Sequence, residues 1–280
     1  MGKGNFITFK RGILLVFATV LFGRCSMQPE EPIIENPVAE VQLQEHAVYA
    51  VLWHQTAAEY KALCLQTYNL AKLQLDQRLR EHAFPYDLPP AIIMDLDETV
   101  IDNSFYNAQL ILDNDDYVRS TWKEWSDLAN AGAVPGAIEF IKYAKSKNVE
   151  VIFISNRLHR EVPATKINLE KLGLTDVDTL NFHFKMDESS KQGRRDEVSK
   201  EYDVLMLFGD NLADFSSIFD KRSLNDRGEI VDSLSQEFGS HFIILPNVLY
   251  GDWAGALMEY DYALDFEAKD SIRKSYLKGY

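Results

Sequence analysis

Apolar residues recur along this chain with two different spacings, one typical of helices and one typical of buried strands. From Glu40 to about His82 they recur mostly at three- and four-residue steps, and no Gly or Pro interrupts them. A segment of more than 40 residues predicts either two helices or one long helix packed across the main domain. Pro85, Pro89 and Pro90 end this region.

Beyond the prolines, short apolar runs alternate with amphipathic stretches. The runs predict strands at 91–95, 150–155, 181–184, 203–210 and 241–247. The stretches predict helices at 122–130, 135–147 and 161–174. Such alternation is typical of a parallel sheet covered on both faces, so we expect an α/β fold with a three-layer Rossmann-like core. We expect 40–84 and 103–132 to contribute a helical cap.

The composition is that of an ordinary globular domain, with 46% hydrophobic and 26% charged residues in a chain of 280. The net charge of −14 argues against a nucleic-acid polymer as partner, because the chain has no basic patch to displace counterions. The histidines and cysteines lack zinc-ligand spacing.

The N-terminus has a different composition. Segment 1–24 holds four basic and no acidic residues around an uncharged run, Gly12 to Gly23, which is too short to span a membrane. It predicts a signal peptide at 1–24, followed by a Pro- and Glu-rich tether at 25–39 and the main domain at 40–280. The segment resembles bacterial lipoprotein signals, which implies a lipid on Cys25 and a place in the cell envelope, at the outer membrane or its periplasmic face. Arg24 departs from that pattern, which leaves an uncleaved anchor or an ordinary signal peptide open.

Polar side chains follow three of the predicted strands directly. The carboxyl ends of parallel strands meet at one edge of a sheet, where ligands bind, so we expect these groups to lie together. Buried carboxylates need a counter-charge. The groups are Asp95 and Asp97, then Ser155, Asn156 and Arg157, then Asp210 with Asp214 four residues later.

The segment D-L-D-E-T resembles the first motif of the haloacid dehalogenase-like hydrolases. This resemblance implies that Asp95 attacks phosphorus and that Asp97 protonates the leaving oxygen and later activates water. Ser155 matches the second motif, whose hydroxyl and neighbouring amides, including that of Asn156, would hold a phosphoryl oxygen. Carboxylates that cap helices and a serine in a turn are the alternative interpretation.

The third motif of that superfamily is a lysine that pairs with the phosphate. Lys185 and Lys191 are both candidates, and we favour Lys191 because it begins a predicted helix whose free amides could meet the same anion. The resemblance also implies Mg²⁺, bound by Asp95, Asp210 and the backbone carbonyl of Asp97. Asp214 would support this metal shell.

Several segments in order are similar to the class C acid phosphatases, a family of bacterial surface lipoproteins that act on nucleoside monophosphates. They are LDETVIDNS, AVPGAIEF, ISNR, FGDNLADF and LPNVLYGDW. The resemblance implies an aromatic pair that clamps the base, here Trp122 and Tyr250. Core packing is the alternative for both rings, and Leu249 stands where the family often has Asn.

We therefore expect an Mg²⁺-dependent acid phosphatase, a 5′-nucleotidase that hydrolyses small phosphate monoesters through an aspartyl-phosphate. Two alternatives remain open: a phosphotransferase on the same scaffold, and a non-catalytic surface-binding lipoprotein. The oligomeric state is open as well, with a homodimer among the alternatives.

Overall fold

The computed structural model of the protein describes residues 43–81 and 88–280. The predicted signal peptide, the tether and Cys25 lie outside these residues. No helix in the described part of the chain is both long and apolar enough to cross a membrane.

The core is a five-stranded sheet in which all paired strands run parallel, in the order β5-β4-β1-β6-β7. Apolar runs of the length expected for buried strands form it, which confirms the predicted parallel sheet. The strands are β1 (Pro90–Met94), β4 (Glu150–Leu158), β5 (Phe182–Lys185), β6 (Asp203–Gly209) and β7 (Phe242–Ile244).

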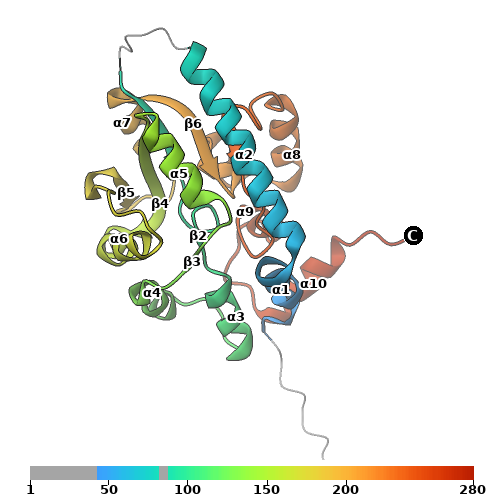
Figure 1. The fold of residues 1–280 in the computed structure, drawn as a ribbon. Coiled ribbons are helices and arrows are strands. Elements are labelled where there is room, and N and C mark those ends of the chain that lie inside the picture. Colours follow the sequence, from blue (N-terminus) through green and yellow to red (C-terminus); the bar gives the residue numbers. More distant parts are fainter. Residues whose placement is uncertain (1–42, 82–87) are drawn as a thin grey trace, which may run out of the picture. The chain divides into compact units, whose positions relative to one another are not determined.

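Alternate side chains of β1 enter two different hydrophobic clusters, because successive strand residues point to opposite faces. Ile92 and Met94 pack in the larger cluster, with apolar residues of α2 (Ala58–Glu81), α5 (Ala137–Ser146) and α6 (Val162–Lys171). Ile93 faces the other cluster, which includes Val198 of α7 (Gln192–Glu201). The fold is therefore the predicted three-layer α/β core (Figure 1).

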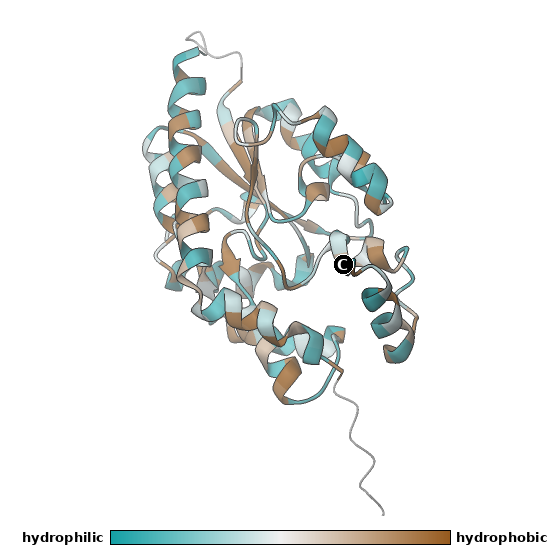
Figure 2. Cartoon of the chain, turned by 90° about the vertical axis from the view of Figure 1, so that its right-hand side faces the viewer, coloured by the Kyte–Doolittle hydropathy of each residue, from teal (hydrophilic) through white to brown (hydrophobic). Residues whose placement is uncertain are grey.

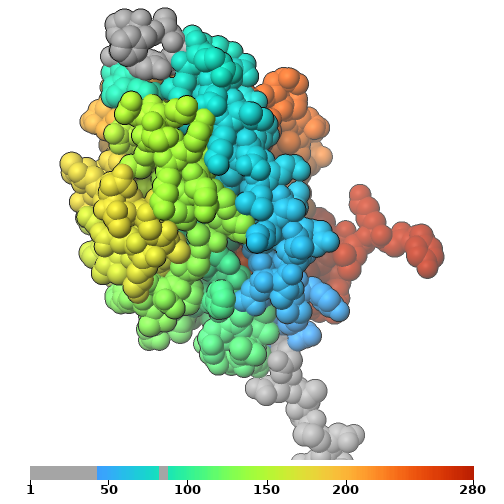
Figure 3. Space-filling model, viewed as in Figure 1, coloured from blue at the N-terminus to red at the C-terminus, as the bar shows by residue number. Residues whose placement is uncertain are grey.

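The helices carry their hydrophilic residues outward and enclose strands that are almost uniformly hydrophobic (Figure 2). On one face, α2 and α5 lie side by side, and their side chains close over the sheet (Figure 3). The Tyr68 hydroxyl of α2 donates to the Thr99 carbonyl over 2.6 Å, and Tyr68 is completely buried. Helix α2 thus helps to hold the loop that follows β1 in place.

The N-terminal helical segment is broken at Ala57, whose ψ of 122° lies outside the helical range. It comprises α1 (Val48–Thr56), preceded by a 3₁₀ turn at Glu45–Ala47, and then α2. Helix α2 packs on the sheet, whereas α1 contacts α3 (Ser104–Leu112). Of the segment 40–84, we therefore propose that α1 alone joins the cap.

Segment 103–132 leaves the sheet after the first strand and returns to it before α5. It contains α3 and α4 (Arg119–Leu128), and a two-stranded antiparallel ribbon, β2 with β3, closes its base. The remaining elements follow the sheet or connect its strands. They are β2 (Ile101–Asp102), β3 (Gly132–Ala133), α8 (Leu224–Ser233), α9 (Asp252–Leu257), α10 (Phe266–Ser275) and 3₁₀ turns at His159–Glu161, Thr179–Asn181, Leu212–Asp214 and Ser217–Phe219.

Candidate active site

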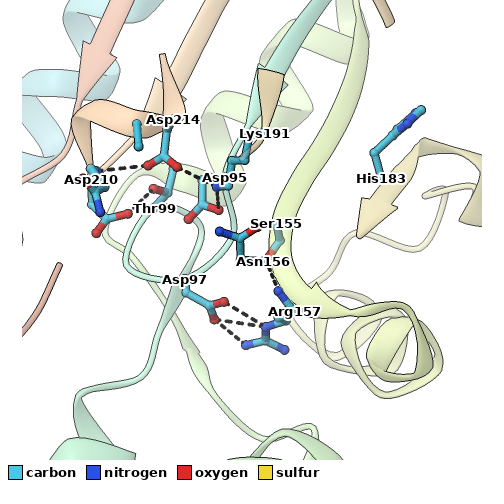
Figure 4. Close-up of polar contacts among 12 residues, drawn as sticks. Asp95, Asp97, Thr99, Ser155, Asn156, Arg157, His183, Lys191, Asp210 and Asp214 are labelled. Carbon is cyan, nitrogen blue, oxygen red and sulfur yellow. Dashed lines mark hydrogen bonds and ion pairs between the residues drawn. The ribbon is translucent and has the colours of Figure 1, made fainter. Parts of the chain in front are cut away.

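Carboxylates gather at the carboxyl edge of the two central strands. Asp95 follows β1 directly, and its backbone N–H donates to the Phe208 carbonyl of β6 over 2.9 Å. Asp210 follows β6 in the same way, and a 3₁₀ turn then brings Asp214 back toward it. The sheet ladder thus fixes the backbone of the first two carboxylates, and all three approach one another (Figure 4).

Lys191 lies between two of these carboxylates. Its ammonium donates to Asp95 Oδ1 and, over 2.6 Å, to Asp214 Oδ1, and its side chain is only 7% exposed. Burial lowers the pKa of Lys191, but Asp214 and Asp95 more than offset this, and the ammonium stays charged. Lys185, the other lysine considered, instead donates to Ser189 Oγ over 2.5 Å.

The three carboxylates form a donor set that suits a hard divalent cation. Oxygen atoms of Asp95, Asp210 and Asp214 all lie within 4.8 Å of one another. Burial raises the pKa of Asp95 well above its usual range, although Lys191 opposes this. Burial and the charge of Asp214 raise the pKa of Asp210 to about 7.

The donor set also leaves a charge that one divalent cation would balance. Among the ion pairs of residues 43–81 and 88–280, one ammonium, that of Lys191, contacts these three carboxylates, whose charge exceeds it by two. The raised pKa values of Asp95 and Asp210 follow from this crowding and from burial. Oxygen ligands are those that Mg²⁺ prefers, so the residues present fit this ion.

Asp210 is also held by neutral groups. Thr99 Oγ1 donates to Asp210 Oδ1 over 3.3 Å, and Asn247 Nδ2 donates to Asp210 Oδ2 over 2.7 Å. Asn247 belongs to the predicted segment LPNVLYGDW, which therefore reaches the carboxylate cluster. Neutral donors fix the carboxylate's direction without neutralising it, which suits a metal ligand.

Asp97 lies apart from the cluster and pairs with an arginine. Arg157 Nε and Nη2 donate to Asp97 Oδ1 over 3.0 and 2.7 Å, and Asn103 Nδ2 donates to the same oxygen over 2.8 Å. Arg157 is 4% exposed, whereas the Asp97 side chain is 19% exposed, so the guanidinium is buried and the carboxylate stays partly accessible. The Asp97 side chain is thus directed toward the cap, and Figure 4 shows it separated from Asp210 and Asp214.

The predicted phosphate-binding pair, Ser155 and Asn156, lies near the carboxyl end of β4. Ser155 is completely buried, and its hydroxyl accepts from the Arg157 backbone N–H over 3.1 Å. Asn156 is exposed, and its Oδ1 accepts from Arg194 Nη2 over 2.7 Å. The β4–β5 ladder shifts register between Ser155 and Leu158, an irregularity of the kind found beside active sites.

The two predicted clamp residues lie on different elements, and neither is a fully buried core ring. Trp122 of α4 contacts the Tyr106 ring edge-to-face at 5.3 Å and lies against the Arg157 guanidinium at 5.5 Å. Tyr250 is 37% exposed. Among the described residues, no ring contact joins Trp122 to Tyr250.

Sequence reasoning assigned no role to three residues that the structure brings to this site. Arg157 and Asn103 both bind Asp97, and Arg194 Nη1 donates to the Ser155 carbonyl over 2.6 Å. Arg157 was visible at a strand end, and Asn103 stands close behind D-L-D-E-T. The pair of Arg157 and Asp97 joins the ends of the neighbouring strands β4 and β1. The partners of Asn103 and Arg194 depend on how the cap and α7 pack, which no local pattern encodes.

Comparisons with known proteins give matches over most of the chain. Residues 23–253 match the family model for the haloacid dehalogenase-like (HAD) superfamily, subfamily IIIB (acid phosphatase). The structure of the class C acid phosphatase from Bacillus anthracis is similar, with a TM-score of 0.81 and 40% identity over 86% of this chain and 100% of that one. The same enzyme with tungstate bound also gives a TM-score of 0.81, at 41% identity and the same coverage.

The match spans most of the chain, in both sequence and structure. The protein therefore belongs to the subfamily IIIB acid phosphatases of the HAD superfamily, and it is a phosphomonoesterase. The resemblance to class C acid phosphatases is confirmed, and so is the fold class.

Proposed function

We propose that the protein hydrolyses phosphate monoesters through an aspartyl-phosphate formed on Asp95. The observation that carries this proposal is the pairing of Asp95 with Lys191, at the carboxyl end of β1 and beside Asp210 and Asp214. A nucleophile at the end of a strand in the sheet keeps its position during attack. The adjacent ammonium offsets the charge of the incoming phosphate.

The reaction would proceed in two steps. In the first, an oxygen of Asp95 bonds to phosphorus while the bond to the alcohol oxygen breaks, and Asp97 gives that oxygen a proton. In the second, Asp97 takes a proton from water as the water oxygen attacks phosphorus and Asp95 is released. The buried Ser155 and the neighbouring Asn156 would hold the phosphoryl oxygens together with Lys191.

The acidic cluster is evidence for a resident Mg²⁺. Asp95, Asp210 and the backbone carbonyl of Asp97 would bind this ion, and Asp214 would support these ligands. When bound, this ion would neutralise charge that develops on the transferring phosphoryl group. Asp214 contacts Lys191 over 2.6 Å, so it would also keep the ammonium directed at the nucleophile. Without such an ion and Lys191, the incoming phosphate would meet only the negative charge of the carboxylates.

We propose nucleoside 5′-monophosphates as the substrate class. Trp122 and the half-exposed Tyr250 would stack on the base, a mode of binding that tolerates different bases. The relative from Bacillus anthracis binds tungstate, a tetrahedral oxyanion that resembles phosphate in shape and charge, and this supports a phosphate site here. The net charge of −14 also favours a small-molecule substrate over a nucleic-acid polymer, because an acidic protein repels a polyanion.

We also propose that a lipid on Cys25 anchors the protein in the bacterial cell envelope, at the outer membrane or its periplasmic face. The support is the apolar run before Cys25 and the polar tether after it. Replacement of Cys25 by Ser should move the protein from the membrane fraction to the soluble fraction. A variant that stays in the membrane at unprocessed size would show an uncleaved anchor instead.

The activity is tested with a panel of phosphate monoesters, with Mg²⁺ and with a chelator. We expect phosphate release that requires the metal and favours nucleoside monophosphates over sugar phosphates that lack a base. Addition of small alcohols separates hydrolysis from phosphoryl transfer, because a transferase would form new esters. Binding of nucleotides without phosphate release would overturn the proposal.

A further inference from the structure

We infer that the cap helix α4 positions the general acid Asp97 through a relay of two hydrogen bonds, Trp125 to Asn103 and Asn103 to Asp97. Asn103 and Trp125 are thus positioning residues. The inference rests on the proposed function, because it assumes that Asp97 transfers the proton. It adds a second task to a helix that already carries the proposed clamp residue Trp122.

The relay has a fixed direction. The Trp125 indole Nε1 donates to Asn103 Oδ1 over 2.9 Å, and Asn103 Nδ2 donates to Asp97 Oδ1 over 2.8 Å. An indole nitrogen can only donate, and an ionised carboxylate can only accept. The Asn103 amide therefore has one orientation that satisfies both neighbours, with its oxygen toward Trp125 and its nitrogen toward Asp97.

Asn103 occupies a position where its side chain would ordinarily stabilise a helix. It is the N-cap of α3 and is completely buried, yet its side chain makes no cap hydrogen bond. Asp102 Oδ1 accepts from the Ser104 backbone N–H over 2.8 Å at this helix start. An Asn in this position normally caps the helix, so its use on Asp97 favours a role in the site over a role in folding.

The backbone of Asn103 is fixed as well. Its N–H donates to Glu98 Oε1 over 2.8 Å, and Glu98 is completely buried. The Glu98 φ of 57° lies in the left-handed region, which bends the loop after Asp97 sharply. The bend brings Asn103 within reach of Asp97, six residues earlier.

Arg157 holds the same carboxylate from the other side. Its guanidinium donates from Nη2 to Asp97 Oδ1 over 2.7 Å and from Nε to Oδ2 over 3.2 Å. Within the described part of the chain, Oδ1 accepts from Asn103 and from two Arg157 nitrogens, whereas Oδ2 accepts only the longer of the Nε contacts. The geometry therefore assigns the transferable proton to Oδ2. That proton passes to the alcohol oxygen as its bond to phosphorus breaks, and Asp97 is left ionised.

Helix α4 contributes to both supports of Asp97. Trp125 lies three residues after Trp122, so both rings project from one side of the helix. The Arg157 guanidinium lies against the Trp122 ring at 5.5 Å, and Trp122 Nε1 donates to Glu161 Oε1 over 3.0 Å. A base stacked on Trp122 would thus bind to the same helix that orients the proton donor.

The relay is tested with two esters that carry similar rings but differ in their need for a proton. Nitrophenolate leaves as a stable anion, whereas the alkoxide from benzyl phosphate needs protonation. We therefore compare kcat/KM for benzyl phosphate with kcat/KM for 4-nitrophenyl phosphate, and the ratio of the two reports on the general acid. The parameter kcat/KM is used because it covers only the steps through phosphoryl transfer to the enzyme.

Trp125→Phe removes the indole N–H and keeps an aromatic ring. Asn103→Ser shortens the side chain and keeps a residue that suits an N-cap. We expect either change to lower the ratio by about tenfold, a fraction of the total general-acid contribution of about 10²–10⁴. Trp53→Phe, the same substitution on α1, is the matched control and should leave the ratio unchanged.

Asp97→Asn separates failure of the relay from failure of the proposed function. If Asp97→Asn lowers the ratio and the Trp125 and Asn103 variants do not, the relay is wrong and Asp97 remains the acid. If Asp97→Asn leaves the ratio unchanged, Asp97 is not the acid and both proposals fall. Equal losses on the two esters in Trp125→Phe and Asn103→Ser would mean that these residues serve packing alone.

Discussion

Replacement of Lys191 by Met tests the charge balance of the acidic cluster. Methionine keeps most of the length of the lysine stem and removes only the ammonium. Lys191, Asp95 and Asp214 have side chains that are 7%, 8% and 7% exposed, so both carboxylates lose their partner without gaining access to water. Removal of one member of a buried ion pair costs about 3–5 kcal/mol.

For a domain of this size, about 1 kcal/mol corresponds to roughly 2–4 °C in Tm. We therefore expect the metal-free Lys191→Met variant to melt about 10 °C below the parent at pH 8. Burial raises the pKa of Asp95 in the folded state, and loss of the opposing ammonium raises it further. A carboxyl whose folded-state pKa is raised contributes its full stability below its unfolded pKa, about 4, and loses it as pH rises. The deficit should therefore be smaller at pH 5 than at pH 8.

The measurement is thermal unfolding of metal-free protein at both pH values, followed by circular dichroism. Lys185→Met is the matched control, because the Lys185 ammonium donates to the Ser189 hydroxyl rather than to a carboxylate, and Lys185 lies at a partly exposed position of β5. We expect the control to change Tm little. A Lys191→Met variant that melts within about 2 °C of the parent at pH 8, or a control that is equally unstable, would refute the reasoning.

Three further predictions concern Tyr250, Gly209 at the end of β6 and His54 on α1. Tyr250→Ala should raise KM for nucleoside monophosphates about tenfold and barely change KM for a small alkyl phosphate, because stacking on one ring is worth about 1–3 kcal/mol. Steady-state kinetics on both substrates checks this, and equal increases in KM would mean that Tyr250 serves packing instead. Gly209→Ala should abolish most activity while Gly193→Ala, at an open position, should not, because a Cβ at Gly209 would lie 2.4 Å from Asp214 Cβ. Burial lowers the pKa of His54 to about 4, so its folded state resists protonation, and stability is lost as pH falls from the unfolded value near 6.5. Between pH 8 and pH 5, the free energy of unfolding measured in urea should therefore fall by about 2 kcal/mol more in the parent protein than in His54→Gln. Equal decreases in the two proteins would show that His54 is not responsible.

The fold could be predicted from sequence because its signals are local. Each strand is an apolar run bounded by polar or proline residues, and β1 begins at Pro90, where the prolines end the preceding region. The strand ends also indicated where Asp95 and Asp210 would meet, since parallel strands share one carboxyl edge. The break between α1 and α2 was less visible, because Ala57 is neither Gly nor Pro.

The contacts that support Asp97, the proposed general acid, could not be predicted. Asn103 and Trp125 are separated by 22 residues, and only the folding of segment 103–132 brings them together. Arg157 and Asp97 are separated by 60 residues and lie at the ends of the neighbouring strands β4 and β1, but the strand ends alone do not show which of their side chains pair. The residue types alone permit ordinary alternatives, since Asn103 stands at a helix N-cap and Trp125 on an amphipathic helix. Hydrogen-bond partners at such separations follow from tertiary structure.

Covalent capture of the phosphoryl group on Asp95 tests the central claim most directly. Enzyme mixed with ³²P-labelled substrate, quenched in acid within one turnover and digested, should carry an acyl-phosphate label on the peptide that contains Asp95. The label should be sensitive to hydroxylamine and absent from Asp95→Asn, whose kcat should fall by about 10³ or more. A label on another residue, or an Asp95→Asn variant that still turns over near the parent rate, would contradict the account.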